Sequence, residues 1–409
     1  MGNYMKKRKL ILHIGTEKTG TSSIQSFLYE NKKLLAKKGY HFIQSLGIRN
    51  NRDLPSMFMN DEHFDDYYIE RGISSIEGKQ KLFEQKSQSL KLELAGLSDS
   101  IHTVIISSEH FHSRVKSLDK ILELKSYLDA FFDEFKVISY IREQTQLIVS
   151  LYSTILKSGG VVELSEYAST NCKPNNDYFN YDLFLSKWQE AFGLQSMCVR
   201  LFDRNSFHKK SLLLDFLKST HIEATSLNID VNIENESLNP FGQLLQSVTN
   251  KMFPRHLDGL GINLNHQLLT RYVTENYSGK GINLAPNESF EIRERFLYSN
   301  ELIKERYFKE HHGELFPVKS ESPSSISISN EDVSKLIAYI HQFQTIASFP
   351  KSVEIPDLYA DILRDTAIEY ENKDINKSYH LMRLANKIRP NGPLIKNKLL
   401  SYSSLFFKS

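Results

Sequence analysis

The sequence predicts an α/β fold: a parallel β-sheet flanked by helices, with an added helical region toward the C-terminal end. Short apolar runs, among them residues 9–14, 103–106 and 135–141, have the pattern of buried strands. Amphipathic segments of helical length separate these runs. Parallel neighbours in a sheet must be joined by crossover segments, so this alternation favours a parallel sheet with right-handed connections.

Turn-forming residues and changes of periodicity set the expected elements in order. The first helix is expected over 21–38 because Gly39 suits the position after a helix end. Residues 44–78 are polar and irregular, as in a segment that lines a substrate cleft or in a surface insertion. Strands are also expected at 40–43 and 197–202, and helices at 79–97, 118–131, 164–169, 181–192, 212–218, 241–253, 263–277 and 287–310.

A stretch rich in proline and serine, residues 314–330, has the composition of a linker. Residues 1–313 are expected to form the α/β domain with its helical C-terminal part, and residues 331–409 a helical extension. This extension is expected to hold a helix over 331–346 and, from residue 355, a tetratricopeptide-like hairpin with a further helix. Because a solitary repeat cannot stack, we expect it to pack on the main domain, with capping or self-association as alternatives.

The composition places limits on the surroundings and partners of the protein. A net charge of +2 gives no basis for a nucleic-acid partner, and two cysteines cannot form a disulfide framework. The sequence shows no signal peptide and no membrane-spanning run, so a cytoplasmic location is expected. The basic residues 5–9 are expected to be a solvated leader, with weak contact to an acidic membrane surface as the alternative.

The rest of the chain is organised around the polar loop that follows its first strand. Gly15 and Gly20 let the backbone turn and approach an anion closely. The first N–H groups of the next helix have no intrahelical partner and lie at the positive end of its dipole. Lys18 adds a full positive charge. Hydroxyl donors come from Thr19, Thr21, Ser22 and Ser23. This strand, loop and helix therefore predict a phosphate-binding site.

The loop differs from a nucleotide P-loop in the position of its lysine. The pattern G-x-x-x-x-G-K-[ST] places a lysine directly after the second glycine, where this chain has Thr21. The lysine here is Lys18, inside the loop. The run from Lys18 to Thr21 resembles the 5′-phosphosulfate-binding loop of sulfotransferases that use 3′-phosphoadenosine 5′-phosphosulfate (PAPS). The resemblance implies that residues 18–23 bind this group and that Lys18 stabilises charge on the leaving oxygen.

A second motif follows the strand at 135–141. Arg142 leaves the strand, Ser150 lies in the following helix, and Tyr152 comes two residues later. A guanidinium binds phosphate through two donors, so Arg142 could share an anion with Ser150 by folding back over the helix. The spacing resembles the 3′-phosphate motif of the same sulfotransferases. Together the motifs imply a P-loop-kinase-like fold over about residues 9–310. They also imply PAPS as co-substrate, 3′-phosphoadenosine 5′-phosphate (PAP) as product, and no required metal.

Glu109 and His110 follow the strand at 103–106 and are the candidates for a general base. Strand ends at this edge of an α/β sheet are where ligands bind. Sulfotransferases commonly carry a His or Glu base in this part of the chain, because the acceptor hydroxyl must lose a proton. We favour Glu109 over His110. A metal held by His110 and His112 is disfavoured, since no third ligand is apparent nearby.

The resemblance to bacterial members of the family implies an acceptor hydroxyl on a carbohydrate, either a surface or capsular glycan or a glycolipid. Phe202 and Arg204 match a segment that lies near the nucleotide in these proteins, although core packing is the favoured role of Phe202. Two other functions remain open. One is a nucleotide or small-molecule kinase, against which Thr21 counts; the other is a non-catalytic glycan-binding or scaffold protein.

Overall fold

The computed structural model describes residues 8–230, 237–257, 261–318, 339 and 357–406. The chain divides into two compact units, one within Met1–Lys335 and the other within Leu336–Ser409. The expected linker is described only up to residue 318, and the expected helix over 331–346 lies outside the described residues except for residue 339.

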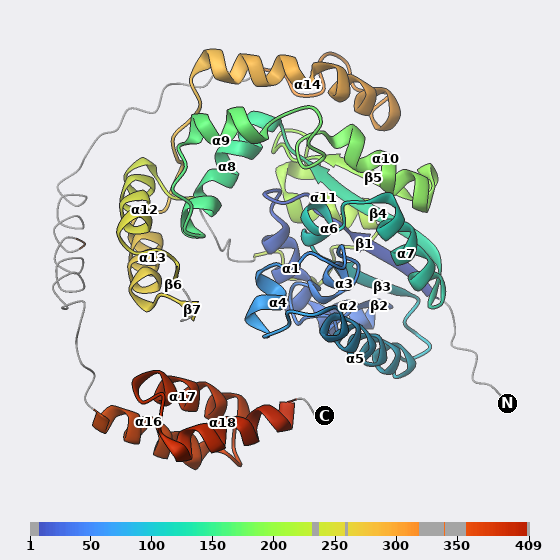
Figure 1. Ribbon diagram of the computed structural model, residues 1–409. Coiled ribbons are helices and arrows are strands. Elements are labelled where there is room, and N and C mark those ends of the chain that lie inside the picture. Colours follow the sequence, from blue (N-terminus) through green and yellow to red (C-terminus); the bar gives the residue numbers. More distant parts are fainter. Residues whose placement is uncertain (1–7, 231–236, 258–260, 319–338, 340–356, 407–409) are drawn as a thin grey trace. The chain divides into compact units, whose positions relative to one another are not determined.

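A parallel sheet of five strands forms the centre of the first unit, in the order β2-β3-β1-β4-β5 (Figure 1). Its strands are β1 (Arg8–His13), β2 (Tyr40–Phe42), β3 (Thr103–Ser107), β4 (Phe132–Ile141) and β5 (Met197–Leu201). The predicted α/β class, a parallel sheet flanked by helices, is therefore confirmed. Because all five strands run the same way, the segments that follow β1, β3, β4 and β5 start at one edge of the sheet.

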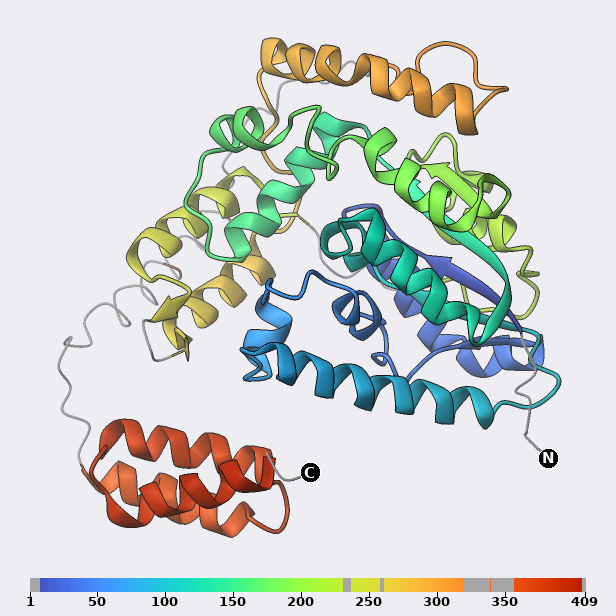
Figure 2. The same cartoon turned by 45° about the vertical axis from the view of Figure 1, so that its right-hand side comes forward.

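Helices cover both faces of this sheet. In β1, Leu10 and Leu12 join one hydrophobic core and Ile11 joins the other, as alternation along a strand requires. Figure 2 shows helices on both sides of the sheet. The first core also holds side chains of α5, α7, α8 and α10, and the second those of α1, α2 and α11. These helices are α1 (Thr21–Glu30), α2 (Lys32–Lys37), α5 (Ile76–Ala95), α7 (Leu118–Asp129), α8 (Gln144–Lys157), α10 (Tyr181–Phe192) and α11 (Leu212–Thr220).

The remaining elements of the first unit are mostly short. The expected irregular insertion contains α3 (Asp53–Met57) and α4 (Asp66–Glu70). The others are α6 (His110–Arg114), α9 (Leu164–Asn171), α12 (Pro240–Met252), β6 (His256–Leu257), β7 (Gly261–Ile262), α13 (Leu264–Asn276), α14 (Pro286–Tyr307) and two short 3₁₀ helices, η1 (Leu194–Ser196) and η2 (His208–Lys210). The helices α12, α13 and α14 agree with the sequence prediction. The β6–β7 hairpin was not predicted, because two-residue strands carry no periodicity.

Two expectations are corrected at the start of the chain. The helix expected over 21–38 is broken at Asn31, whose side-chain amide donates to the carbonyls of Phe27 and Asn228 at 3.0 and 2.8 Å. Arg8 and Lys9 are not a solvated leader, since both belong to β1. Arg8 is buried and its Nε donates to the Ile101 carbonyl at 2.9 Å. The rest of that basic run lies outside the described residues.

The second unit contains the helices α16 (Asp357–Tyr370), α17 (Ile375–Ile388) and α18 (Pro393–Phe406). They share a small core that includes Ala360, Met382 and Tyr402. The helices α16 and α17 form a hairpin, and α18 follows it.

Candidate active site

The loop between β1 and α1 presents an open helix N-terminus at the carboxyl edge of the sheet. Gly20 is the N-cap of α1 with a φ of 73°, and Lys18 has a φ of 64°. Within the described parts of the chain, the N–H groups of residues 18–22 form no hydrogen bond, whereas those of Ser23 and Ile24 donate to the Gly20 carbonyl. Such a run of donors at the positive end of a helix is suited to an anion.

Gly20 is packed from behind by two other segments. A Cβ added there would lie 2.4 Å from Leu212 Cδ2 and 3.2 Å from Phe202 Cε2. Leu212 is the first residue of α11, which is held to the sheet because the buried Asp215 carboxylate accepts hydrogen bonds from Arg200 and Tyr140. The loop therefore depends on a residue without a side chain at position 20.

We expect Gly20→Ala to lower the free energy of unfolding by about 1 kcal/mol more than Gly72→Ala does. Both glycines have a positive φ, so the strain of a left-handed alanine is common to both variants. Only at position 20 does the added methyl group also overpack its surroundings. The free energy lost to this overpacking should be small for such a contact, because the Leu212 methyl can shift. Urea denaturation of both variants measures the difference; equal losses would contradict the packing described for Gly20.

Two buried threonines stabilise the loop from within. The Thr16 hydroxyl donates to the Tyr140 carbonyl at 2.9 Å, and the Thr19 hydroxyl donates to the Thr16 carbonyl at 2.6 Å. The sequence predicts an anion-binding hydroxyl at Thr19, but its proton is used inside the loop. Thr21, Ser22 and Ser23 form the first turn of α1, as predicted.

Lys18 connects the loop to α8. Its Nζ donates to the Thr154 hydroxyl at 2.8 Å, and its carbonyl accepts from Arg142 Nη1 at 3.0 Å. The two motifs found in the sequence are therefore in direct contact. Ser150 lies one turn before Thr154 on the same face of α8. Thr154 was not found by sequence reasoning, because a threonine inside a helix carries no signal of its own.

Tyr152 is buried in the first core, only 3 % exposed, whereas Ser150 is partly exposed. Two residues correspond to about 200° around a helix, so Tyr152 points away from the face that carries Ser150 and Thr154. Tyr152 therefore packs in the first core, and its role in binding PAPS stays a prediction from the sequence.

Burial lowers the pKa of Lys18 to about 8, and the nearby charges of Lys157 and Arg142 act in the same direction. Glu17 and Glu109 act in the opposite direction. Among the described residues Lys18 forms no ion pair with a carboxylate. The loop thus holds a partly desolvated cation, which an incoming anion would stabilise.

Glu109 lies directly against the loop, because a Cβ added to Gly15 would be 3.1 Å from Glu109 Cα. One carboxylate oxygen, Oε2, accepts from Gln25 Nε2 at 2.6 Å and from Asn50 Nδ2 at 3.0 Å. These amides come from α1 and from the insertion, and they fix the carboxylate at the strand end. Neither amide was identified from the sequence.

His110 follows at the start of α6. Its Nδ1 is buried and has no hydrogen-bond partner among the described residues. Burial is the main cause of its lowered pKa; the neighbouring Glu109 opposes this effect and the Arg52 charge adds to it. His110 is therefore neutral near pH 7 and can accept a proton.

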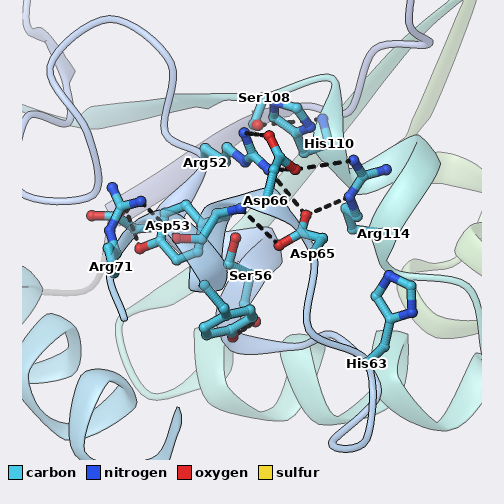
Figure 3. Close-up of polar contacts among 12 residues, drawn as sticks. Arg52, Asp53, Ser56, His63, Asp65, Asp66, Arg71, Ser108, His110 and Arg114 are labelled. Atoms are coloured by element: carbon cyan, nitrogen blue, oxygen red, sulfur yellow. Dashed lines mark hydrogen bonds and ion pairs between the residues drawn. The ribbon is translucent and has the colours of Figure 1, made fainter. Parts of the chain in front are cut away.

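A charge network in the insertion lies beside His110, as Figure 3 shows. Arg52 Nη2 donates to Asp65 and Asp66 at 3.0 and 2.7 Å, and Arg114 Nε donates to Asp65 at 2.6 Å. Burial alone would raise the pKa of Asp65, but the two guanidinium groups outweigh it and lower that pKa. The network joins the insertion to α6 and so helps to place Asn50 on Glu109.

Glu17 and His112 form a second polar group under the loop. The Tyr178 hydroxyl donates to Glu17 Oε2 at 2.8 Å, while the Glu17 N–H donates to His112 Nδ1 at 3.3 Å. His112 Nε2 is then the protonated nitrogen and donates to the Tyr178 carbonyl at 3.0 Å. Burial lowers the pKa of His112 to about 3, so this histidine is a neutral structural residue.

Phe202 contacts both halves of the site, and Arg204 does not. The Arg142 guanidinium lies 5.4 Å from the Phe202 ring centre, and the ring also packs against Gly20. Beside Phe202 is a cavity of about 70 Å³ that Gln146 also lines. Arg204 is exposed, and no contact to the described residues brings its side chain to the loop.

In the described part of the chain, no group of three or more His, Cys, Asp or Glu side chains is arranged to hold a metal ion. No described helix has both the length and the apolar character needed to span a membrane.

Comparison with known proteins gives few similarities. No protein-family model matches the chain. A crystallised sulfotransferase from Alicyclobacillus acidocaldarius aligns over 60% of this chain and 90% of that chain, with a TM-score of 0.35 and 14% identity. An uncharacterised protein of Archaeoglobus fulgidus is 27% identical over 216 residues, which are 51% of this chain and 54% of the archaeal protein. The chain thus matches about half the length of this relative.

Proposed function

We propose that the protein is a sulfotransferase that moves the sulfuryl group of PAPS to a hydroxyl group of a carbohydrate acceptor. The supporting observation is the convergence at one sheet edge of three features. These are the open N-terminus of α1, the paired cations Lys18 and Arg142, and the Glu109 carboxylate packed on the loop. An anion site beside a fixed carboxylate is suited to group transfer from a bound anion to a nearby hydroxyl.

The residues then have the following roles in the reaction. The loop N–H groups and Lys18 bind the 5′-phosphosulfate, and Arg142 with Ser150 binds the 3′-phosphate. The acceptor oxygen forms a bond to sulfur while the bond from sulfur to the 5′-phosphate oxygen breaks. The electron pair of the broken bond stays on PAP, where Lys18 stabilises it, and the acceptor proton passes to Glu109 or His110.

Titration calorimetry with PAP, ADP and ATP, without added metal, tests this proposal. We expect PAP to bind at least ~100-fold more tightly than ADP, because only PAP offers a 3′-phosphate to Arg142 and each such charge-assisted contact contributes about 1.5–3 kcal/mol. Preferential binding of ATP with Mg²⁺ would indicate a kinase. The absence of nucleotide binding would favour a glycan-binding or scaffold protein.

The affinity for PAP is expected to fall as the pH rises above about 8, where Lys18 loses its proton. The bound anion favours protonated Lys18, so binding takes up a proton and the affinity falls up to tenfold per pH unit. Calorimetry at pH values between 7 and 10, chosen around that pKa, measures the fall in affinity. Repeating it in buffers of different ionisation enthalpy measures the proton uptake. A Lys18→Arg variant, which stays charged, should lack this dependence. An unchanged profile in that variant would show that another group titrates.

A further inference from the structure

Lys157 is a third cation near this site, after Lys18 and Arg142, and the sequence motifs do not include it. It is the last residue of α8, three positions after Thr154 and seven after Ser150. Residues at this spacing lie along one face of a helix, so Ser150, Thr154 and Lys157 form one line of polar side chains. Thr154 marks where this line meets the loop, because its hydroxyl accepts from Lys18 Nζ at 2.8 Å.

The direction of α8 places Lys157 on the far side of Lys18 from Arg142. Arg142 precedes the first turn of α8 and contacts the Lys18 carbonyl, whereas the Lys18 side chain reaches Thr154 near the other end. Lys157 lies roughly 4.5 Å further along the axis, at a rise of about 1.5 Å per residue. Along α8 the order is therefore Arg142, then Lys18, then Lys157.

The two lysines affect each other. Lys157 is partly buried, burial lowers its pKa, and its charge helps to lower the pKa of Lys18. The nearby carboxylates of Glu17 and Glu109 accept hydrogen bonds from Tyr178, Gln25 and Asn50. An anionic group between the two ammonium groups would offset both their desolvation and their repulsion.

We propose that Lys157 binds the oxygens of the sulfuryl group of PAPS, in line with Lys18 and beyond the 5′-phosphate. This inference rests on the proposed function, in which Arg142 holds the 3′-phosphate and Lys18 the 5′-phosphate. The sulfuryl group is then the next anionic part of PAPS on the side away from Arg142. Lys157 distinguishes PAPS from PAP, because only PAPS carries that group.

Calorimetry with both nucleotides tests the inference without an acceptor. In Lys157→Met we expect the dissociation constant of PAPS to rise about tenfold and that of PAP to change less than twofold. Lys157→Arg should keep most of the affinity for PAPS. Lys251→Met, at an exposed lysine on α12, should change neither constant.

Equal losses for PAPS and PAP in Lys157→Met would overturn the inference, because Lys157 would then serve the nucleotide phosphates or the fold. Unchanged affinity for both would overturn it as well. A Lys157→Gln variant with the thermal midpoint of the wild type keeps the test valid if the Met variant folds poorly. If the protein is not a sulfotransferase, the wild type itself should not bind PAP. This result differs from every outcome described for the Lys157 variants.

Discussion

Replacing Arg142 with alanine is expected to weaken the binding of PAP at least ~100-fold and to change the binding of ADP much less. If Arg142 binds the 3′-phosphate as proposed, the variant loses two charge-assisted hydrogen bonds, each contributing about 1.5–3 kcal/mol, whereas ADP has no 3′-phosphate to lose them from. Two contacts orient the Arg142 side chain: Nη1 donates to the Lys18 carbonyl, and the guanidinium lies beside the Phe202 ring. Calorimetry with both nucleotides measures the two losses.

The matched control is Arg271→Ala, which removes an exposed guanidinium on α13 and should leave both affinities unchanged. Arg142 also supports the loop through the Lys18 carbonyl. If that support were its main role, PAP and ADP would lose affinity together, and the assignment of Arg142 to the 3′-phosphate would be wrong.

Glu109→Gln is expected to reduce the turnover number about 10²- to 10⁴-fold, the usual contribution of a general base, with PAP binding unchanged. Glutamine keeps the shape of the side chain but cannot accept the acceptor proton. Glu109 is the better candidate because its backbone packs against the loop and two amides orient one carboxylate oxygen. Transfer from PAPS to carbohydrate acceptors measures the loss.

His110→Ala is the comparison, and we expect a loss of tenfold or less. His110 is neutral near pH 7 because burial lowers its pKa, so it also has the protonation state of a base. A large loss in His110→Ala with normal turnover in Glu109→Gln would transfer the role to His110. Normal turnover in both variants would exclude both residues as the base.

Much of the site could be predicted because local patterns encode it. The β1 strand, the loop with Lys18 and the start of α1 form one continuous stretch, and Arg142 directly follows a buried strand. Parallel strands share one carboxyl edge, so the segments after β1, β3 and β4, which carry Lys18, Glu109 and Arg142, start at the same edge of the sheet. The break at Asn31 could not be predicted, since its amide binds a carbonyl 197 residues away.

The sequence by itself determined the fold class, the strands and the residue types at their ends, because these depend on hydrophobic period and on glycine positions. Only the tertiary structure decided which side chains complete the site. Thr154 contacts Lys18 across 136 positions, and Gln25 contacts Glu109 across 84. Such contacts leave no local pattern, because each depends on how separate helices pack on the sheet. The packing of α8 on the sheet likewise decided that Tyr152, which matches the sequence motif, lies in the first hydrophobic core.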